Sequence, residues 1–371
     1  YSATTPCDLR VVEKMQPFFT KNFGNPSSNH EYGETARKHI EYAKEHIANA
    51  IGAESTKDII FTSGATESNN IAIKGMINNK KNHIITTNIE HKCVLESCKY
   101  VEQFNCDVTY VPVETNGIVS IDKIRQAIRP NTGMISILWI QNEIGTIQAI
   151  EEIGELCEQH NIYLHVDAAQ ALGRIPINVR KAKIATMSIS GHKIYGPKGI
   201  GVLYIRRNPR VILHKWISGG GQERGYRSGT IPTALCVGIG RACELLDEHH
   251  KFVDTIRDYE QYFLQQLLPL TEVYMNGDPM HKVPHILNLS FAGVEGEALM
   301  MQVPDLILSS GSACNSATLE PSHILQGIKL STNLIHTSIR IVFGKPTTWY
   351  EVQKAVNQIK QAVIKLRNIS P

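Results

Sequence analysis

Short apolar runs alternate with amphipathic stretches up to about residue 230. The runs that we interpret as buried strands lie at 58–62, 83–87, 134–140, 162–166, 185–190 and 201–205. Helix-like segments follow two of these runs, from about Glu67 to Gly75 and from about Cys93 to Phe104. Buried strands that alternate with helices are typical of a mostly parallel sheet covered by helices on both faces. The pattern therefore predicts an α/β fold.

The pattern changes after about Pro232. A long helical stretch over about 233–270 leads to apolar runs at 283–291, 306–310 and 338–343, and the final segment from Thr347 to Arg367 has helical periodicity. We interpret this part as a smaller α+β domain, with the N-terminal residues packed against it. The predicted division is 15–232 for the large domain, and 1–14 with 233–371 for the small one.

Composition and charge narrow the class of protein. A chain of 371 residues is more than one core usually holds, which agrees with two domains. The net charge is +3 without a block of like charges, which argues against a nucleic-acid-binding surface. No apolar run approaches the roughly 18 residues of a membrane helix. The eight cysteines include no C-x-x-C pair, so we expect reduced thiols in a reducing compartment.

One cysteine, Cys314, lies in the small-residue segment SSGSACNSATLEPS at 309–322. Nothing in this segment can bury the thiol, and no second Cys or His stands at metal spacing. An accessible thiol is a candidate nucleophile, whereas a buried one would be inert. His91 and Cys93 are too close along the chain for a standard zinc pair and no matching pair follows, so we expect no metal site.

A lysine follows directly after a predicted strand in SISGHKIYGPKG at 188–199. Most lysines lie on solvated surfaces, and that remains the alternative for Lys193. At a strand end among glycines, however, Lys193 can form a Schiff base with an aldehyde cofactor. Ser190 and His192 are placed to hydrogen-bond a phosphate.

An aspartate, Asp167, ends the apolar run IYLHV in the segment HVDAAQ at 165–170. Ligands of open α/β sheets bind at the carboxyl ends of strands. The alternative is a capping residue for the next helix. The functional interpretation pairs Asp167 with the nitrogen of a pyridoxal phosphate ring, which keeps the ring an electron sink. Gln170 could then hydrogen-bond the ring hydroxyl oxygen.

A third segment, FTSGATESNN at 61–70, runs from a strand through a Gly-containing turn into a helix. Backbone N–H groups at the helix start, such as that of Ala65, form an anion site, and Gly64 permits close approach. Thr66 can add a hydroxyl. An ordinary capping turn, made by Thr66 with the acidic Glu67, explains the same residues equally well.

Further candidates come from isolated polar residues beside apolar runs. His91 is more often structural in such a position, but beside a pyridoxal ring it would stack on one face and could carry protons. Asn142 can contact the ring oxygen or the substrate. The Gly-rich segment 219–230 is either a flexible surface loop or a site for phosphate or dimer contacts. Arg340 enters an apolar strand and needs an anionic partner, which a substrate α-carboxylate would supply.

The order and spacing of these motifs resemble the cysteine desulfurases, pyridoxal phosphate enzymes of fold type I and the NifS/IscS type. The resemblance covers the whole chain and rests on ATTP (3–6), FGNP (23–26), TSGATES (62–68), EHK (90–92), NEIG (142–145), DAAQ (167–170), SGHKIYGPKGIG (190–201), GGGQERG-x-RSGT (219–230), SSGSAC (309–314), LEPS (319–322) and SIR (338–340). The long cysteine loop is similar to that of class I enzymes, and several phrases look mitochondrial or α-proteobacterial.

The resemblance implies a role for each candidate. Pyridoxal 5'-phosphate would be bound by Lys193, Asp167, Gln170, Asn142, Ala65, Thr66, Ser190, His192 and, from the partner subunit of a homodimer, Thr230. His91 would stack on the ring, Arg340 would bind the substrate carboxylate, and Cys314 would accept sulfur. Asn315 and Thr318 stand where Thr and Ser are usual in the family, and His323 where Tyr is usual, so we expect differences in loop behaviour and not in chemistry.

The resemblance also implies a reaction and partners. L-cysteine would give L-alanine and a persulfide on Cys314, which supplies sulfur for iron–sulfur cluster assembly. The implied partners are an iron–sulfur scaffold protein, with frataxin and a small LYR-type protein with acyl carrier protein as further ones; nucleic acid and membrane are not expected. The implied location is a mitochondrion or an organelle derived from one, with the bacterial cytoplasm as the alternative. A selenocysteine lyase, an aminotransferase and a non-catalytic scaffold are the competing functions.

Overall fold

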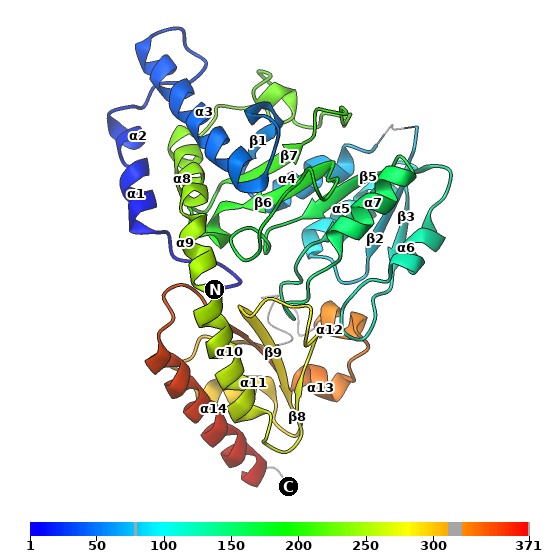
Figure 1. Ribbon diagram of the computed structural model, residues 1–371, viewed down its shortest axis with the longest axis vertical. Helices are drawn as coiled ribbons and strands as arrows, with labels where there is room; N and C mark the ends of the chain where they lie inside the picture. The colour runs from blue at the N-terminus through cyan, green and yellow to red at the C-terminus, as the bar shows by residue number, and fades with distance from the viewer. Residues whose placement is uncertain (78–79, 311–320, 370–371) are drawn as a thin grey trace.

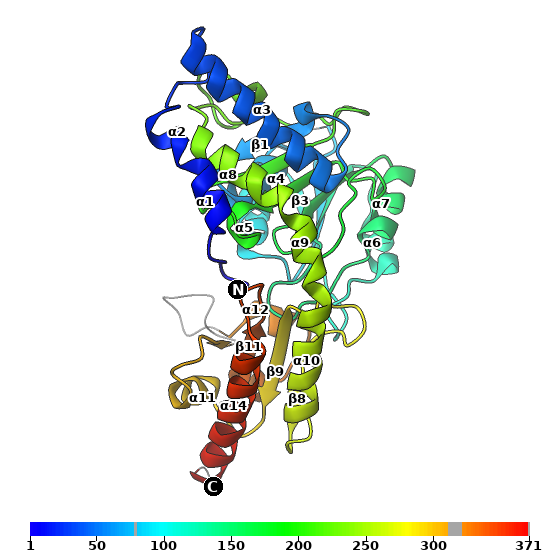
Figure 2. The same cartoon turned by 60° about the vertical axis from the view of Figure 1, so that its left-hand side comes forward.

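The computed structural model describes residues 1–77, 80–310 and 321–369 of the chain. Figure 1 shows a larger α/β part and a smaller part that ends at the C-terminus. The N-terminal residues lie where the two parts meet (Figures 1 and 2). They can therefore contribute to a site between the strands of the larger part and the smaller part.

The larger part is built on a seven-stranded sheet of order β1-β7-β6-β5-β4-β2-β3. Its strands are β1 (Ile59–Thr62), β2 (His83–Thr87), β3 (Asp107–Val111), β4 (Thr132–Leu138), β5 (Tyr163–Asp167), β6 (Thr186–Ser190) and β7 (Gly201–Ile205). Strands β3, β2, β4, β5 and β6 pair in parallel, and β7 runs antiparallel to both of its neighbours. The prediction of a mostly parallel sheet is confirmed.

All six predicted strands belong to this sheet, with ends that differ by at most two residues from those expected. Within this sheet, the strand that the sequence analysis missed is β3. It lies at the sheet edge and most of its side chains are only partly buried, so DVTYV mixes polar and apolar residues instead of forming a continuous apolar run.

Helices cover both faces of the sheet. One face packs against α3 (Glu31–Ile51), α7 (Ile150–Gln159) and α8 (Thr233–Glu244), and the opposite face against α4 (Ala65–Lys74) and α5 (Lys92–Glu102). The remaining elements of this part are α1 (Leu9–Met15), α2 (Pro17–Thr20) and α6 (Ile121–Ala127), with 3-10 turns at Thr56–Asp58, Gly191–Lys193 and Glu223–Gly225. Because both faces are covered, ligands can reach the sheet only at its edges and strand ends.

The smaller part contains an antiparallel sheet of order β10-β11-β9-β8. Its elements are β8 (Val273–Met275), β9 (Ile286–Phe291), β10 (Ser309–Ser310), β11 (Ser338–Val342), α10 (Val253–Leu267), α11 (Gly296–Gln302), α12 (His323–Gly327), α13 (Thr332–His336) and α14 (Trp349–Ile369). Residues of α10, α11 and α14 share a hydrophobic core with β8, β9 and β11. This α+β arrangement agrees with the expectation for the C-terminal part.

The predicted long helix over 233–270 is three consecutive helices, α8, α9 (Leu246–Lys251) and α10. Residues of α8, such as Cys236 and Ile239, lie in the core of the larger part, whereas α10 belongs to the core of the smaller one. The division into 15–232, and 1–14 with 233–371, stays a prediction. Because α8 and α10 belong to different cores, we propose that the boundary predicted between residues 232 and 233 lies closer to Phe252.

A buried ion pair attaches the Gly-rich loop to the sheet. Lys44 Nζ on α3 lies 3.0 Å from Glu223 Oε1, and the Phe61 N–H of β1 donates to Glu223 Oε2 at 2.7 Å. The Glu223 side chain is only 3% exposed. Removing one partner of such a pair leaves the other charge buried and unpaired, which costs more than the pair itself stabilises.

We expect Glu223→Ala to lower the free energy of unfolding by about 3–5 kcal/mol, because Lys44 and the Phe61 N–H lose their partner. Urea unfolding followed by circular dichroism measures the loss. Glu114→Ala is the matched control, since it breaks an exposed ion pair with Lys123 and should change stability far less. Equal losses in the two variants would contradict the importance of burial.

Two kinds of feature are absent from residues 1–77, 80–310 and 321–369. The helices there lack the combination of length and apolar character that crossing a bilayer requires. No group of three or more His, Cys, Asp or Glu side chains in the same ranges is arranged to hold a metal ion. Polar side chains instead gather in one pocket of the larger part.

Candidate active site

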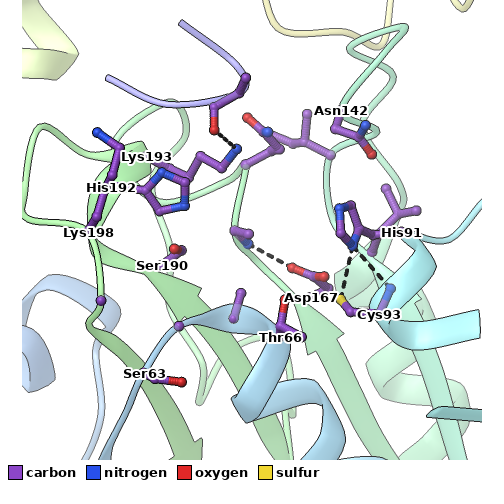
Figure 3. A pocket seen from close by; sticks show the side chains of 18 residues that line it. Ser63, Thr66, His91, Cys93, Asn142, Asp167, Ser190, His192, Lys193 and Lys198 are labelled. Atoms are coloured by element: carbon purple, nitrogen blue, oxygen red, sulfur yellow. Dashed lines mark hydrogen bonds between the residues drawn. The ribbon is translucent and has the colours of Figure 1, made fainter. Parts of the chain in front are cut away.

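A pocket of about 490 Å³ opens at the carboxyl ends of β1, β4, β5 and β6. Its lining comes from residues at the carboxyl ends of these strands, from His91 and Cys93 after β2, from Lys198 and Gly199 before β7, and from Ala3 of the N-terminal segment. Figure 3 shows Lys193 and His91 on different sides of the pocket, with Asp167 between them. This is the edge at which open α/β sheets bind ligands.

Most of the predicted site residues line this pocket. They are Lys193, Asp167, His91, Asn142, Gln170, Ala65, Thr66, Ser190 and His192. These residues come from five separate segments of the chain, so only the fold brings them together.

An anion cradle forms at the start of α4. The backbone N–H groups of Ala65 and Thr66 lie in the first turn of this helix and at the pocket wall, where they can bind a phosphate. A Cβ at Gly201 would approach Gly64 Cα to 2.5 Å, so β7 fits behind the turn only with glycine there. Glu67 holds the turn in shape, because its Oε2 accepts the Ser63 N–H at 2.6 Å.

Asp167 ends β5 and is only 7% exposed. Its Oδ1 accepts the Ala169 N–H at 2.9 Å, and its Oδ2 accepts Asn69 Nδ2–H at 2.8 Å. An ionised carboxylate can accept about four hydrogen bonds. Asp167 is therefore held firmly and still has acceptor capacity for a cationic N–H group in the pocket.

Lys193 reaches from the turn after β6 to the N-terminal segment. Its Nζ donates to the Ala3 carbonyl oxygen at 2.7 Å and also to that of Ser2. His192 beside it contacts Thr4 Oγ1 through Nδ1 at 3.1 Å, and burial, followed by the charges of Lys193 and Lys198, lowers the pKa of His192 to about 4. His192 is therefore neutral and adds no positive charge to the side of the pocket that Lys193 and Lys198 line.

His91 precedes α5, and its Nδ1 accepts the Cys93 N–H at 3.2 Å. Cys93 Sγ lies 3.0 Å from the same nitrogen. Burial lowers the pKa of His91, although the carboxylate of Asp167 opposes the shift. A neutral ring whose Nδ1 is an acceptor carries its proton at Nε2.

Arg340 on β11 is 9% exposed and does not line the pocket itself. Its Nη1 donates to the Asn142 carbonyl oxygen at 3.0 Å, and its Nη2 donates to Ser309 Oγ at 3.3 Å. Within the part of the chain that the structure describes, no carboxylate forms an ion pair with this guanidinium. Arg340 thus lies next to the pocket through Asn142, with capacity for an anion.

Among the described residues, Thr230 is a second predicted site residue, besides Arg340, that does not line the pocket. Thr230 is exposed. Cys314 lies outside the described residues, so its role stays a prediction from the sequence. Gln170 lines the pocket, but its amide already donates to the Ser2 carbonyl oxygen at 3.0 Å and accepts from Arg174.

The structure adds residues that the sequence analysis did not propose for the site. They are Ala3, Ser63, Cys93 and Lys198 in the lining, and Asn69 behind it. Cys93 could have been predicted from the sequence, because it lies only two residues after the candidate His91. Asn69 carried none, because a polar residue inside a helix usually faces solvent.

Comparison with known proteins supports an enzyme of a defined family. A model of the aminotransferase class-V family matches residues 1–354. Proteins named cysteine desulfurase IscS from Rickettsia prowazekii and Rickettsia typhi are 50% and 51% identical over 377 residues, which cover 100% of this chain and 92% of theirs.

Solved structures agree with this relationship. A NifS-like protein superposes with a TM-score of 0.91 at 33% identity and covers 98% of both chains. SspA, solved in complex with cysteine, superposes with a TM-score of 0.83 at 38% identity and covers 92% of this chain and 97% of its own. The predicted fold and the predicted resemblance are both confirmed. The chain therefore belongs to the aminotransferase class-V family of pyridoxal phosphate-dependent enzymes, alongside the cysteine desulfurases named IscS.

Proposed function

We propose that this protein is a cysteine desulfurase that transfers the sulfur of L-cysteine to the thiol of Cys314. One observation carries the proposal: an amine, a carboxylate and an anion cradle share one pocket, in a chain half identical to proteins of that name. Fold alone would not be enough, because one fold supports many activities.

The pocket fits pyridoxal 5'-phosphate in size and in chemistry. The phosphate would be held by the N–H groups of Ala65 and Thr66 and by the side chains of Ser190 and His192. Residue 64 is a glycine, so no Cβ at this position stands between the phosphate and the backbone of the cradle. Asp167 would accept the ring N–H, and Lys193 would bind the aldehyde carbon. When bound, this cofactor stores the electron pair that is released at the substrate Cα.

The proposed substrate site uses Arg340 and Asn142. A guanidinium binds a carboxylate through two parallel hydrogen bonds, which fixes the orientation of an amino acid. The contact of Arg340 with the Asn142 carbonyl oxygen aims the guanidinium toward the pocket from the smaller part. Substrate orientation would thus depend on the contact between the two parts of the chain.

Proton transfer is assigned to Lys193 and His91. The Lys193 amine takes the proton from the substrate Cα, and the ammonium that results can donate to the Ser2 and Ala3 carbonyl oxygens, which already lie within reach. His91 carries its proton at Nε2, on the side opposite to its Cys93 contacts. The neutral ring donates this N–H as a hydrogen bond, and His91 acts as a general acid only after it has taken up a second proton.

The sulfur transfer is assigned to Cys314. Its thiolate attacks the sulfur of L-cysteine, so that a new S–S bond forms while the Cβ–S bond of the substrate breaks. The electron pair of the broken bond stays with Cβ, which takes up a proton and becomes the methyl group of L-alanine. The sulfur remains as a persulfide on Cys314.

We also propose partners, an oligomeric state and a cellular location for this protein. The persulfide would supply sulfur to an iron–sulfur scaffold protein, with frataxin and a small LYR-type protein with acyl carrier protein as further partners. A homodimer is proposed because Thr230 is exposed outside its own pocket and could complete the neighbouring one. The relatives named above are bacterial, which supports the bacterial cytoplasm, and a mitochondrial location stays a prediction.

The test is a product assay on the purified protein loaded with pyridoxal phosphate. With L-cysteine and a thiol reductant, we expect L-alanine and sulfide in equal amounts, because each turnover transfers one sulfur. D-cysteine is the control, since its carboxylate cannot reach Arg340 with Cα facing Lys193. Release of selenide from selenocysteine alone, or transfer of an amino group to a keto acid, would replace the desulfurase proposal.

A further inference from the structure

A completely buried asparagine connects several groups of the site from behind the pocket. Asn69 lies on α4 and is 0% exposed. Its Nδ2 donates to Asp167 Oδ2 at 2.8 Å and to Cys93 Sγ at 3.1 Å. Its Oδ1 lies 2.9 Å from His165 Nε2. His165 and Asp167 are two residues apart on β5, so both side chains point to the face of the sheet that α4 covers.

The hydrogen-bond directions in this cluster follow from its chemistry. The carboxylate of Asp167 only accepts, which assigns the amide nitrogen of Asn69 to its side. The amide oxygen of Asn69 must then accept from His165, so His165 is protonated at Nε2. Its Nδ1 accepts from the Thr186 hydroxyl at 2.8 Å. Burial lowers the pKa of His165 to about 3, which keeps the ring neutral.

The same cluster continues to His91. Burial raises the pKa of Cys93 to about 12, so the group is a thiol with one S–H to donate. Its sulfur accepts from Asn69 and lies 3.0 Å from His91 Nδ1, which also accepts the Cys93 N–H. The S–H of Cys93 can therefore donate to His91 Nδ1, and Thr66 is a further side-chain hydrogen-bond partner of this thiol. Donors and acceptors match from Thr186 through His165, Asn69 and Cys93 to His91.

We propose that Asn69 is a positioning residue that holds the Asp167 carboxylate and, through Cys93, the His91 imidazole in one hydrogen-bonded unit. The inference deepens the proposed function, because it assumes that Asp167 and His91 face the cofactor ring. The amide of Asn69 thereby fixes the position of Asp167, which would accept the ring N–H, relative to His91, which would stack on the ring face. A buried hydrogen bond to a charged group is worth more than a neutral one, so loss of Asn69 should weaken the ring contact directly.

The experiment compares Asn69→Ala with Thr109→Val. Each variant removes the hydrogen-bond partner of a buried histidine nitrogen. His165 Nε2 lies 2.9 Å from Asn69 Oδ1, and His83 Nε2 lies 2.9 Å from Thr109 Oγ1. Only Asn69 also touches Asp167. Urea unfolding should show that both variants lose stability, whereas cofactor readouts should separate them.

Asn69→Ala should raise the dissociation constant of pyridoxal phosphate about tenfold, the effect of losing one charge-assisted hydrogen bond. It should also shift the pH midpoint of the bound cofactor's absorbance change, because the ring nitrogen loses part of its stabilisation by Asp167. Thr109→Val should leave both quantities at the wild-type values. Equal cofactor affinity and equal absorbance titrations in all three proteins would overturn the proposal.

A second variant covers the case in which Asn69→Ala does not fold. Asn69→Asp keeps the acceptor for His165, and its carboxyl can donate to Asp167 only when it is protonated. Its affinity for pyridoxal phosphate, relative to wild type, should therefore improve as the pH is lowered, and a pH-independent ratio would overturn the proposal. These readouts need no turnover. A wild-type protein that binds pyridoxal phosphate but releases no sulfide would contradict the desulfurase proposal, and the comparison of variants would still decide this one.

Discussion

Replacement of Lys193 by alanine should lower kcat/KM for sulfide release from L-cysteine by at least about a thousandfold. General acid–base catalysis contributes roughly 100- to 10,000-fold on its own, and this lysine is also the proposed attachment point of the cofactor. Its amine extends toward the pocket from the turn after β6 and is held by two carbonyl oxygens of the N-terminal segment. No other amine has that combination of contacts among the described residues that line the pocket.

The measurement pairs turnover with an absorbance spectrum. Lys193→Ala should bind pyridoxal phosphate without the absorbance band of the lysine-bound form, because the phosphate cradle and Asp167 remain. Lys198→Ala is the matched control, since it removes a second, exposed lysine from the same pocket and should cost far less activity. A Lys198 variant as inactive as the Lys193 variant would contradict the assignment of the proton-transfer group.

The second large effect is expected for Cys314→Ala. This variant should bind pyridoxal phosphate and L-cysteine as the wild type does, yet release no sulfide above the background without enzyme. The reason is that the thiol supplies the nucleophile for the substrate sulfur, and no group of the cofactor can replace it. Quantification of sulfide and of the persulfide by mass spectrometry measures the effect.

Cys93 is the competing thiol, because it lines the pocket. Burial raises its pKa to about 12, so almost none of it is thiolate at neutral pH and it is a poor nucleophile. Cys93→Ala should therefore keep persulfide formation on Cys314, and Cys7→Ala, which removes a partly exposed thiol outside the pocket, should behave as wild type. Persulfide formation that survives in Cys314→Ala and disappears in Cys93→Ala would reverse the assignment.

The strands and most of the pocket could be predicted because each has a local cause. Buried parallel strands need continuous apolar runs, and functional side chains follow those runs at the carboxyl ends, as Asp167 and Lys193 do. The edge strand β3 escaped prediction, since an edge position does not require a continuous apolar run. The break of 233–270 into three helices also escaped, because helical periodicity alone does not show which of two cores a helix joins.

The sequence by itself determined the fold class, the family and the chemical groups of the pocket, since motif order and residue type are properties of the linear chain. Only the tertiary structure decided which groups touch. It set the Ser2 and Ala3 carbonyl oxygens against Lys193, and Asn69 against Asp167, His165 and Cys93. These partners are about 24 to 191 residues apart along the chain, and hydrogen bonds depend on distances of about 3 Å that only packing establishes.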